Sequence, residues 1–413
     1  MTDEPDATAE DALERVATDA PLAVIVEKTR AETAIESLRA EGVYDDSRRV
    51  RESAAETRSN AGDDGDGTAE TVETIALPVT DPPTETRVLD VARQVDPEPR
   101  SPDLEDLLAA RGWSDVELEA APGSWAVIGS VILVTVPEDC PDEAAVGEAL
   151  LELHGEADSV LADEGIENDG EAGTHREPRT RLIAGERDTE TIHTEHGTRY
   201  GLDPASVMFS PGNQAERARM ADVCDDGELV FDMFAGIGYF TLPMARAGAR
   251  VTATEINPTA FRYLLENAVL NDVGDRVDAY MTDCRDLAGE IDADRVVMGY
   301  YGSSEGDGTG GDDRGGSSDA SDASDANDAN DGEHGTRTDE ARDFLPDALE
   351  ALSPGGVVHY HEATPESRLW ERPLARLEAA AEDTGRELEV LEKRRVKSHS
   401  AGVAHVVVDA RFD

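Results

Sequence analysis

The stretch that decides the fold runs from Glu228 to Asn271 and reads ELVFDMFAGIGYFTLPMARAGARVTATEINPTAFRYLLENAVLN. It opens with a short apolar run, 229–231, which is typical of a buried parallel strand, and a glycine turn and a helical pattern follow. A second apolar run at 250–254 predicts the next strand. Asn257-Pro258 then predicts a helix start, because Asn caps helices and Pro fits the first helical position. This order predicts the first β-α-β unit of a doubly wound α/β domain.

A ligand site is expected where these elements meet. In doubly wound domains ligands lie at the carboxyl ends of the strands, against a glycine turn that leads into a helix. Gly236 and Gly238 would let the backbone approach the ligand with no Cβ between them. Glu255 follows the second strand directly, where an acidic side chain can accept both hydroxyls of a ribose. The pattern therefore predicts a ligand that contains a ribose.

Two classes of ligand fit a glycine turn of this kind. A dinucleotide fingerprint, G-x-G-x-x-G/A, would place its third small residue at position 241, where the chain has Thr241. The preceding Asp232-x-Phe234-Ala235-Gly236 resembles instead the first motif of class I methyltransferase-fold enzymes, which bind S-adenosylmethionine. That resemblance implies a Rossmann-like, seven-strand α/β sheet. A dinucleotide oxidoreductase is the more distant alternative.

The composition is strongly acidic. The 413 residues carry a formal net charge of −55, with 92 acidic against 37 basic residues. Either the chain is an acidic disordered protein or it is a folded protein adapted to molar salt, which screens self-repulsion within a few ångströms. The periodic strands and helices favour a folded protein from a halophile. Its charge does not exclude RNA, because molar salt suppresses the phosphate–cation attraction on which binding normally depends.

The cysteines and the apolar runs exclude several other classes of site. Cys140, Cys224 and Cys284 lie far apart, with neither metal-ligand nor disulfide spacing. No signal peptide and no apolar run long enough to span a membrane is present. We therefore expect a cytoplasmic protein without a metal.

We expect four segments along the chain. A small β-α-β domain at 1–80 precedes an acidic, proline-rich linker at 81–120, an α+β middle domain at 121–203 and a catalytic domain at 204–413. The catalytic domain should end in an antiparallel hairpin. A low-complexity insertion at about 302–338, which contains DASDASDANDAN, interrupts this domain and cannot bury enough apolar surface to fold.

Several motifs resemble those of archaeal enzymes that modify the tRNA guanosine 3′ to the anticodon: Phe209-Ser210-Pro211, Glu216-Arg217, Asp232 to Gly236, Asn257-Pro258, and Asn267 with Asn271. Two relatives share this frame, a guanine-37 N1-methyltransferase and a wybutosine-pathway aminocarboxypropyltransferase. They differ after the fourth strand, where the methyltransferase has an Asn-Leu-Pro type motif. This chain reads Met298-Gly299-Tyr300-Tyr301, which is similar to the aminocarboxypropyltransferase, and 357–361 and 402–409 match that family too.

The resemblance is tight over roughly residues 175–413, excluding the insertion, and looser before them. It implies a reaction on tRNA(Phe). The 3-amino-3-carboxypropyl group of S-adenosyl-L-methionine would move to C7 of 4-demethylwyosine at position 37, releasing 5′-methylthioadenosine. The alternative within the class is methylation of guanine 37 at N1. From another class, the chain could be a tRNA-binding module without catalysis, which Glu255 and the glycine turn disfavour.

Carried over residue by residue, the resemblance implies a donor site made of Ser210, Arg217, Asp232, Phe234, Gly236, Gly238, Glu255, Asp283 and Cys284. Arg217 would meet the donor carboxylate as a fork, and Glu255 would bind the ribose. Asp283 would sit by the adenine amino group. Cys284 stands where an amide is expected, so its backbone would serve instead. No acid or base residue is identified, although His359 and His361 share one face of a strand.

The expected partner is the anticodon stem-loop and body of tRNA(Phe), bound by a monomer, and the first domain would contact the tRNA body. Tyr300 and Tyr301 could stack on the tricyclic base or pack in the core. The densest positive cluster, Lys393-Arg394-Arg395-Val396-Lys397, predicts an RNA contact, with a charged strand edge as the alternative. A second candidate is formed by Arg176, Arg179 and Arg181.

Overall fold

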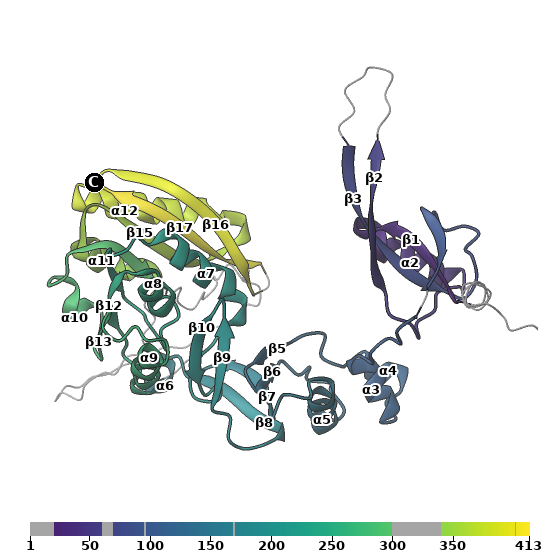
Figure 1. Ribbon diagram of the computed structural model, residues 1–413. Helices are drawn as coiled ribbons and strands as arrows, with labels where there is room; N and C mark the ends of the chain where they lie inside the picture. Colours follow the sequence, from purple (N-terminus) through teal and green to yellow (C-terminus); the bar gives the residue numbers. More distant parts are fainter. Residues whose placement is uncertain (1–19, 60–68, 95, 168–169, 300–339, 401) are drawn as a thin grey trace, which may run out of the picture. The chain divides into compact units, whose positions relative to one another are not determined.

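The computed structural model describes residues 20–59, 69–94, 96–167, 170–299, 340–400 and 402–413. The chain divides into two compact units, Met1–Asp106 and Leu107–Asp413 (Figure 1). Tyr300, Tyr301 and the expected insertion at 302–338 lie outside the described residues. None of the helices in the described part combines the length and apolar character needed to cross a bilayer.

The first unit is a four-stranded sheet in the order β2-β3-β1-β4, covered by one helix. Its elements are β1 (Leu22–Glu27), η1 (Lys28–Arg30), α2 (Ala31–Ala40), β2 (Arg51–Ser59), β3 (Ala69–Val79) and β4 (Asp90–Arg93). The expected β-α-β unit corresponds to β1, α2 and β3. Strand β4 lies within the segment expected to be a linker, and it pairs antiparallel with β1. Leu89 and Ala92 pack against Ala23 and Ile25, so burial of these side chains extends the fold past residue 80.

The second unit starts with an α+β layer. Helix α3 (Leu104–Ala110) spans the boundary between the units, and α4 (Asp115–Leu118) follows it. A four-stranded sheet then forms from β5 (Trp125–Ile128), β6 (Val131–Val134), β7 (Ser159–Ile166) and β8 (Pro178–Gly185), with α5 (Glu143–Leu153) and α6 (Gly170–Thr174) between its strands in the sequence. The next two strands, β9 (Thr191–Glu195) and β10 (Thr198–Leu202), pair as an antiparallel hairpin.

Hydrogen bonds from several residues join the hairpin to the rest of the second unit, and those of Asn267 reach the glycine turn. Asn267 on α9 (Pro258–Leu270) accepts a hydrogen bond from the backbone N–H of Gly201 (2.7 Å). Its amide donates to the carbonyls of Gly201 and Ile237, both at 3.0 Å. Ile237 lies inside the glycine turn, so Asn267 ties the turn to the hairpin.

The catalytic domain holds the predicted seven-stranded sheet, in the order β13-β12-β11-β14-β15-β17-β16. Its strands are β11 (Leu229–Asp232), β12 (Arg250–Thr254), β13 (Val277–Tyr280), β14 (Ala293–Met298), β15 (Leu352–Pro365), β16 (Leu388–Ser400) and β17 (Val403–Phe412). The first five in spatial order pair parallel, and β17 runs antiparallel to both of its neighbours. The fold is thus a class I methyltransferase-type sheet that ends in the expected hairpin.

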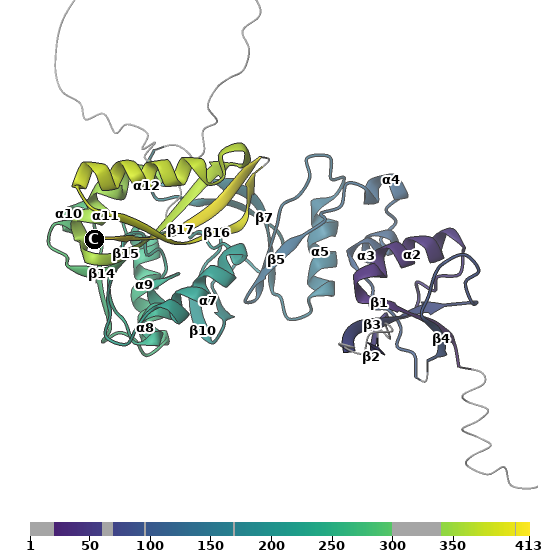
Figure 2. The same ribbon diagram turned by 90° about the horizontal axis from the view of Figure 1, so that it is seen from above.

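Helices cover both faces of this sheet, as Figure 2 shows for α12 on one side and α7 and α8 on the other. One face carries α7 (Gln214–Val223), α8 (Thr241–Ala247) and α9 (Pro258–Leu270), and the other carries α10 (Arg285–Ala288), α11 (Leu345–Ala351) and α12 (Glu371–Thr384). Short 3-10 turns complete the domain: η2 (Pro211–Asn213), η3 (Ala341–Phe344) and η4 (Glu366–Arg368). Val230 and Phe231, successive residues of β11, pack into the two separate cores, as the alternation of a strand requires.

Candidate functional site

A pocket lies at the carboxyl ends of the central strands and encloses roughly 1300 Å³, counting solvent at its open mouth. We call it the strand-end pocket. Seven of the residues expected at the donor site line it: Ser210, Arg217, Phe234, Gly236, Glu255, Asp283 and Cys284. Residues 173–176 and Phe344, which the sequence did not predict as donor-site residues, line it as well.

The glycine turn after β11 has a geometry that only glycine fits. Gly236 and Gly238 have φ values of 56° and 103°. A Cβ on Gly236 would come within 2.2 Å of the Tyr239 ring, and one on Gly238 within 2.7 Å of Leu242 Cγ. Gly236 faces the pocket, whereas Gly238 allows close packing behind it. Gly238 therefore acts by shaping the turn.

Glu255 is held in place by two backbone groups. One carboxylate oxygen accepts from the N–H of Gly236 (2.8 Å) and the other from the N–H of Asn257 (2.6 Å). Burial raises the pKa of this carboxyl group, and the two N–H groups oppose the rise. Each oxygen keeps further acceptor capacity. A carboxylate oriented in this way on the pocket wall can accept two neighbouring hydroxyls.

Asp232 supports the turn from below and does not line the pocket. Its side chain is fully buried, and it accepts from Thr241 Oγ1 (2.7 Å) and more weakly from the N–H of Phe234 (3.4 Å). Burial raises its pKa to about 6. The expectation of direct ligand contact is corrected, because the carboxyl group turns toward the start of α8.

Another part of the pocket lining is aromatic and contains Asp283 and Cys284. The rings of Phe234 and Phe344 meet edge to face, with centroids 4.9 Å apart. Asp283 accepts from the backbone N–H, Nε and Nη2 of Arg285 at 3.1, 3.0 and 2.8 Å. Burial raises the pKa of the Cys284 thiol, so this side chain stays neutral. The wall combines flat apolar surface with one carboxylate, as a heteroaromatic base requires.

Arg217 already has a carboxylate partner. Its Nε and Nη2 donate to Glu195 at 2.6 and 2.7 Å, and its Nη1 donates to the carbonyl of Ser210 at 3.0 Å. Glu195 in turn lies 3.2 Å from His193 Nε2. The Nε–Nη2 edge of Arg217 is therefore occupied, and the expected contact of Arg217 with the donor carboxylate stays a prediction for its remaining N–H groups. Two of its five N–H groups remain available. Glu195 lies 22 residues from Arg217 in the sequence, and no local sequence signal predicts that the two side chains pair.

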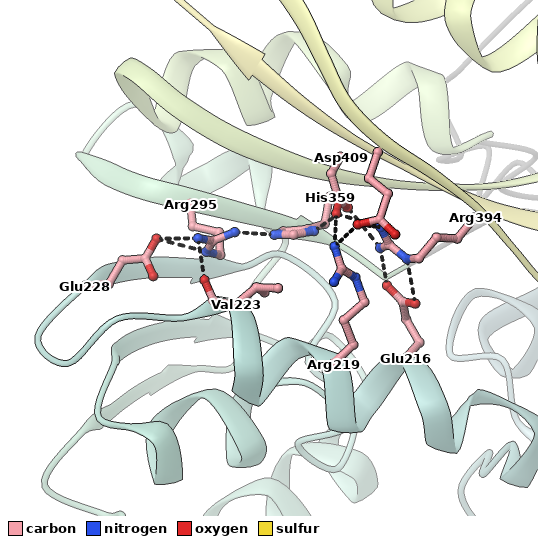
Figure 3. A network of polar contacts seen from close by, with 9 residues as sticks. Glu216, Arg219, Val223, Glu228, Arg295, His359, Arg394 and Asp409 are labelled. Carbon is pink, nitrogen blue, oxygen red and sulfur yellow. Dashed lines mark hydrogen bonds and ion pairs between the residues drawn. The ribbon is translucent and has the colours of Figure 1, made fainter. Parts of the chain in front are cut away.

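Arg394 is also committed to internal partners, as Figure 3 shows. It donates to Glu216 through Nε (3.1 Å) and Nη2 (2.5 Å) and to Asp409 through Nη1 (2.6 Å) and Nη2 (2.9 Å). These contacts tie β16 and β17 to α7. The expectation that Arg394 contacts RNA is therefore corrected, because its guanidinium is neutralised inside the domain.

His359 belongs to the same network (Figure 3). Its Nε2 lies 2.6 Å from Arg295 Nη1 and its Nδ1 lies 2.7 Å from Asp409. Since arginine can only donate, Nε2 accepts and Nδ1–H donates. Burial alone would raise the pKa of Asp409, but hydrogen bonds from His359 and the arginines hold it well below its usual range. His359 thus has a structural part. His361 lies buried beside His405, with Nδ1 and Nε2 3.0 Å apart.

The other residues expected to contact RNA differ in their exposure and in whether they are paired within the chain. Lys393 is exposed, with Nζ 5.7 Å from the centroid of the Trp370 ring, and Arg395 is exposed beside Glu366. Arg176 lines the strand-end pocket, whereas Arg181 is paired with Glu143 and Glu164. Across the described ranges, no cluster of three or more potential metal ligands occurs. The expected RNA contacts of Lys393, Arg395, Tyr300 and Tyr301 remain predictions.

Comparisons with known proteins identify the family. Residues 191–306 and 325–391 match the TRM5/TYW2 methyltransferase domain, and residues 87–189 match the TYW2 N-terminal domain. The chain is 37% identical over 292 residues, 70% of this chain and 89% of the relative, to a tRNA(Phe) (4-demethylwyosine(37)-C(7)) aminocarboxypropyltransferase of Pyrococcus horikoshii. It is 32% identical over 291 residues, 70% of this chain and 75% of the relative, to the tRNA (guanine(37)-N(1))-methyltransferase Trm5b of Pyrococcus abyssi.

A solved structure agrees with this result. The chain resembles P. horikoshii TYW2 in complex with MeSAdo, with a TM-score of 0.56 and 32% identity over 74% of this chain and 96% of that one. The fold and the strand-end pocket agree with these matches. The chain therefore belongs to the TRM5/TYW2 family and carries a TYW2-type N-terminal domain.

Proposed function

We propose that this protein transfers the 3-amino-3-carboxypropyl group of S-adenosyl-L-methionine to C7 of 4-demethylwyosine at position 37 of tRNA(Phe), releasing 5′-methylthioadenosine. The observation that carries the proposal is the Glu255 carboxylate, oriented by Gly236 and Asn257 on the wall of the strand-end pocket. Two relatives support the choice of substrate, since the aminocarboxypropyltransferase is more similar, at 37%, than the methyltransferase, at 32%.

The chemistry asks the protein mainly to position its substrates. All three carbons on the donor's sulfonium are electrophilic, and the one that reacts is the one placed in line with the nucleophile. In this reaction C7 of the base attacks the tail carbon next to sulfur and a C–C bond forms. The C–S bond breaks, its electron pair stays on sulfur, and the C7 proton is released to solvent or a nearby base. The described residues therefore act by binding and orienting.

Each part of the donor has a candidate partner in the pocket. Glu255 would accept the two ribose hydroxyls, and the backbone of Gly236 would lie against the nucleoside. Asp283 would accept from the adenine amino group between the aromatic rings, with the backbone of Cys284 beside it. Ser210 and the two remaining N–H groups of Arg217 would meet the amino-acid tail.

The RNA would approach from the mouth of the pocket. We assign contact with the modified base to Tyr300 and Tyr301, and contact with the anticodon stem-loop to Lys393 and Arg395. We assign contact with the tRNA body to the first unit. We also propose that the protein works as a monomer in the cytoplasm of a halophile, in keeping with its charge of −55.

Two labelled donors test the reaction. Purified protein in concentrated potassium chloride is incubated with tRNA(Phe) bearing 4-demethylwyosine and with donor labelled either in the methyl group or in the carboxyl carbon. We expect only the carboxyl label to enter the tRNA, with methylthioadenosine as the spent donor. A parallel reaction on tRNA(Phe) with guanosine at position 37 tests the alternative, because methyl label in that tRNA with S-adenosylhomocysteine as product would identify a guanine-37 methyltransferase.

A further inference from the structure

Lys397 is an isolated cation beside the strand-end pocket. It is one of only three lysines in the chain, and it lies partly buried on β16. Its Nζ donates to Ser210 Oγ at 2.5 Å. In the described part of the chain, no carboxylate lies within salt-bridge distance of Nζ or shifts its pKa. In a chain with 92 acidic residues, this lysine side chain has no charge partner in that part of the chain.

The neighbouring cations differ from Lys397 in this respect. Arg394, three residues earlier, is neutralised by Glu216 and Asp409. Arg217 is neutralised by Glu195. Burial and the nearby Arg217 lower the pKa of Lys397. Lys397 itself lies behind the lining residue Ser210, and two cations and one carboxylate meet around that serine, which leaves one excess positive charge next to the pocket wall.

An excess positive charge in a half-buried place favours an anionic ligand. Removing an ammonium from water without a partner costs free energy, and an anion that binds beside it recovers part of that cost. The donor carries one anionic group, the carboxylate at the end of its amino-acid tail. Ser210 and Arg217 line the pocket, and Ser210 holds Nζ by a direct hydrogen bond. The loop before α7 packs on the same side chain, because a Cβ on Gly212 would lie 3.1 Å from Lys397 Cδ.

We propose that Lys397 binds the carboxylate of the donor's amino-acid tail, together with Ser210 and the remaining N–H groups of Arg217. This inference rests on the proposed function and assigns the charge that recognises the transferred group. The fork of Arg217 is occupied by Glu195, so Lys397 supplies the charge that Arg217 cannot. Anchoring the far end of the tail fixes the tail carbon next to sulfur, which makes Lys397 a positioning residue for tail transfer.

Binding measurements with three nucleosides test the proposal. S-adenosylmethionine and S-adenosylhomocysteine carry the tail carboxylate, whereas methylthioadenosine lacks the tail. We expect Lys397→Gln to weaken both tailed nucleosides roughly tenfold or more, in line with the loss of a hydrogen bond to a charged group, and to leave methylthioadenosine within twofold. Lys397→Arg should restore most of the affinity. Arg411→Gln, which changes a cation paired with Glu389 at the surface on the neighbouring strand β17, is the control and should change none of the three.

Each other outcome overturns the proposal. Equal weakening of all three nucleosides would mean that Lys397 only supports the fold of the pocket. Unchanged affinity of Lys397→Gln for the tailed nucleosides would mean that the donor carboxylate binds elsewhere. If only tRNA binding were weakened, Lys397 would be a phosphate contact. The labelled-donor experiment with the unmodified protein reports separately on the reaction, so failure of this inference leaves the proposed function intact.

Discussion

Replacing Arg394 with methionine should strongly destabilise the second unit. The Arg394 side chain is 15% exposed, and those of Glu216 and Asp409 are 5% exposed each. Glu216 would lose its one hydrogen-bond partner in the described part of the chain, whereas Asp409 would keep His359 and Arg219. Leaving one buried charge of a pair without compensation costs roughly 3–5 kcal/mol. We expect a loss of stability in this range.

The sequence offers a convenient assay for this loss. All three tryptophans, Trp113, Trp125 and Trp370, lie in the second unit, so their fluorescence follows unfolding of that unit in denaturant. Arg395→Met is the matched control, because Arg395 pairs with Glu366 on the exposed surface and such a pair contributes roughly 0–1 kcal/mol. Salt should be held constant across the series.

A double variant separates the charge effect from lost packing. Changing Glu216 to leucine as well removes the unpaired carboxylate, so Glu216→Leu with Arg394→Met should be more stable than Arg394→Met alone. The reasoning is refuted if Arg394→Met unfolds at the same denaturant concentration as Arg395→Met. It is also refuted if the double variant is less stable than the single one.

Two further predictions concern the strand-end pocket and the glycine turn beneath it. Glu255→Gln should weaken binding of S-adenosylmethionine by about 10- to 100-fold, because it removes a charged acceptor. Isothermal titration calorimetry measures this affinity, and an unchanged value would exclude Glu255 from ribose binding. Burial raises the pKa of Asp232 from 3.8 to about 6, so the folded state holds this proton more tightly than the unfolded state. The contribution of this carboxyl group to the free energy of unfolding is fully present below about pH 4. It falls by about 3 kcal/mol as pH rises through 6. Asp232→Asn should remove this fall, which denaturant unfolding at several pH values will show; an unchanged pH profile would contradict the raised pKa.

The sequence predicted the central β-α-β unit well because its signals are local. The helix after β12 begins at Pro258, and Asn257 caps it by accepting from the N–H groups of Thr259 and Ala260. The helix after the glycine turn ends at Ala247, and Gly248 takes the left-handed conformation there, with φ 115°. Caps, glycine turns and apolar periodicity all act within a few residues, so a single sequence reveals them.

The pairs that tune the site could not be predicted in the same way. Arg217 and Arg394 were both expected to meet ligands, and both are taken by carboxylates within the chain. Arg394 and Glu216 are 178 residues apart. In a chain with 92 acidic residues, composition gives every arginine many possible partners and names none of them.

The sequence by itself determined the seven-stranded sheet, the glycine turn and the acidic residue at the tip of β12, because each depends on the order of neighbouring residues. Only the tertiary structure decided which charges stay free at the pocket. That outcome depends on β9, α7 and β16, distant in the sequence, being brought together, so that Arg217 is paired with Glu195 while Lys397 faces Ser210 without a carboxylate among the described residues. Folding satisfies most buried charges from within the chain, and the charge that it leaves unmatched is the one available to a ligand.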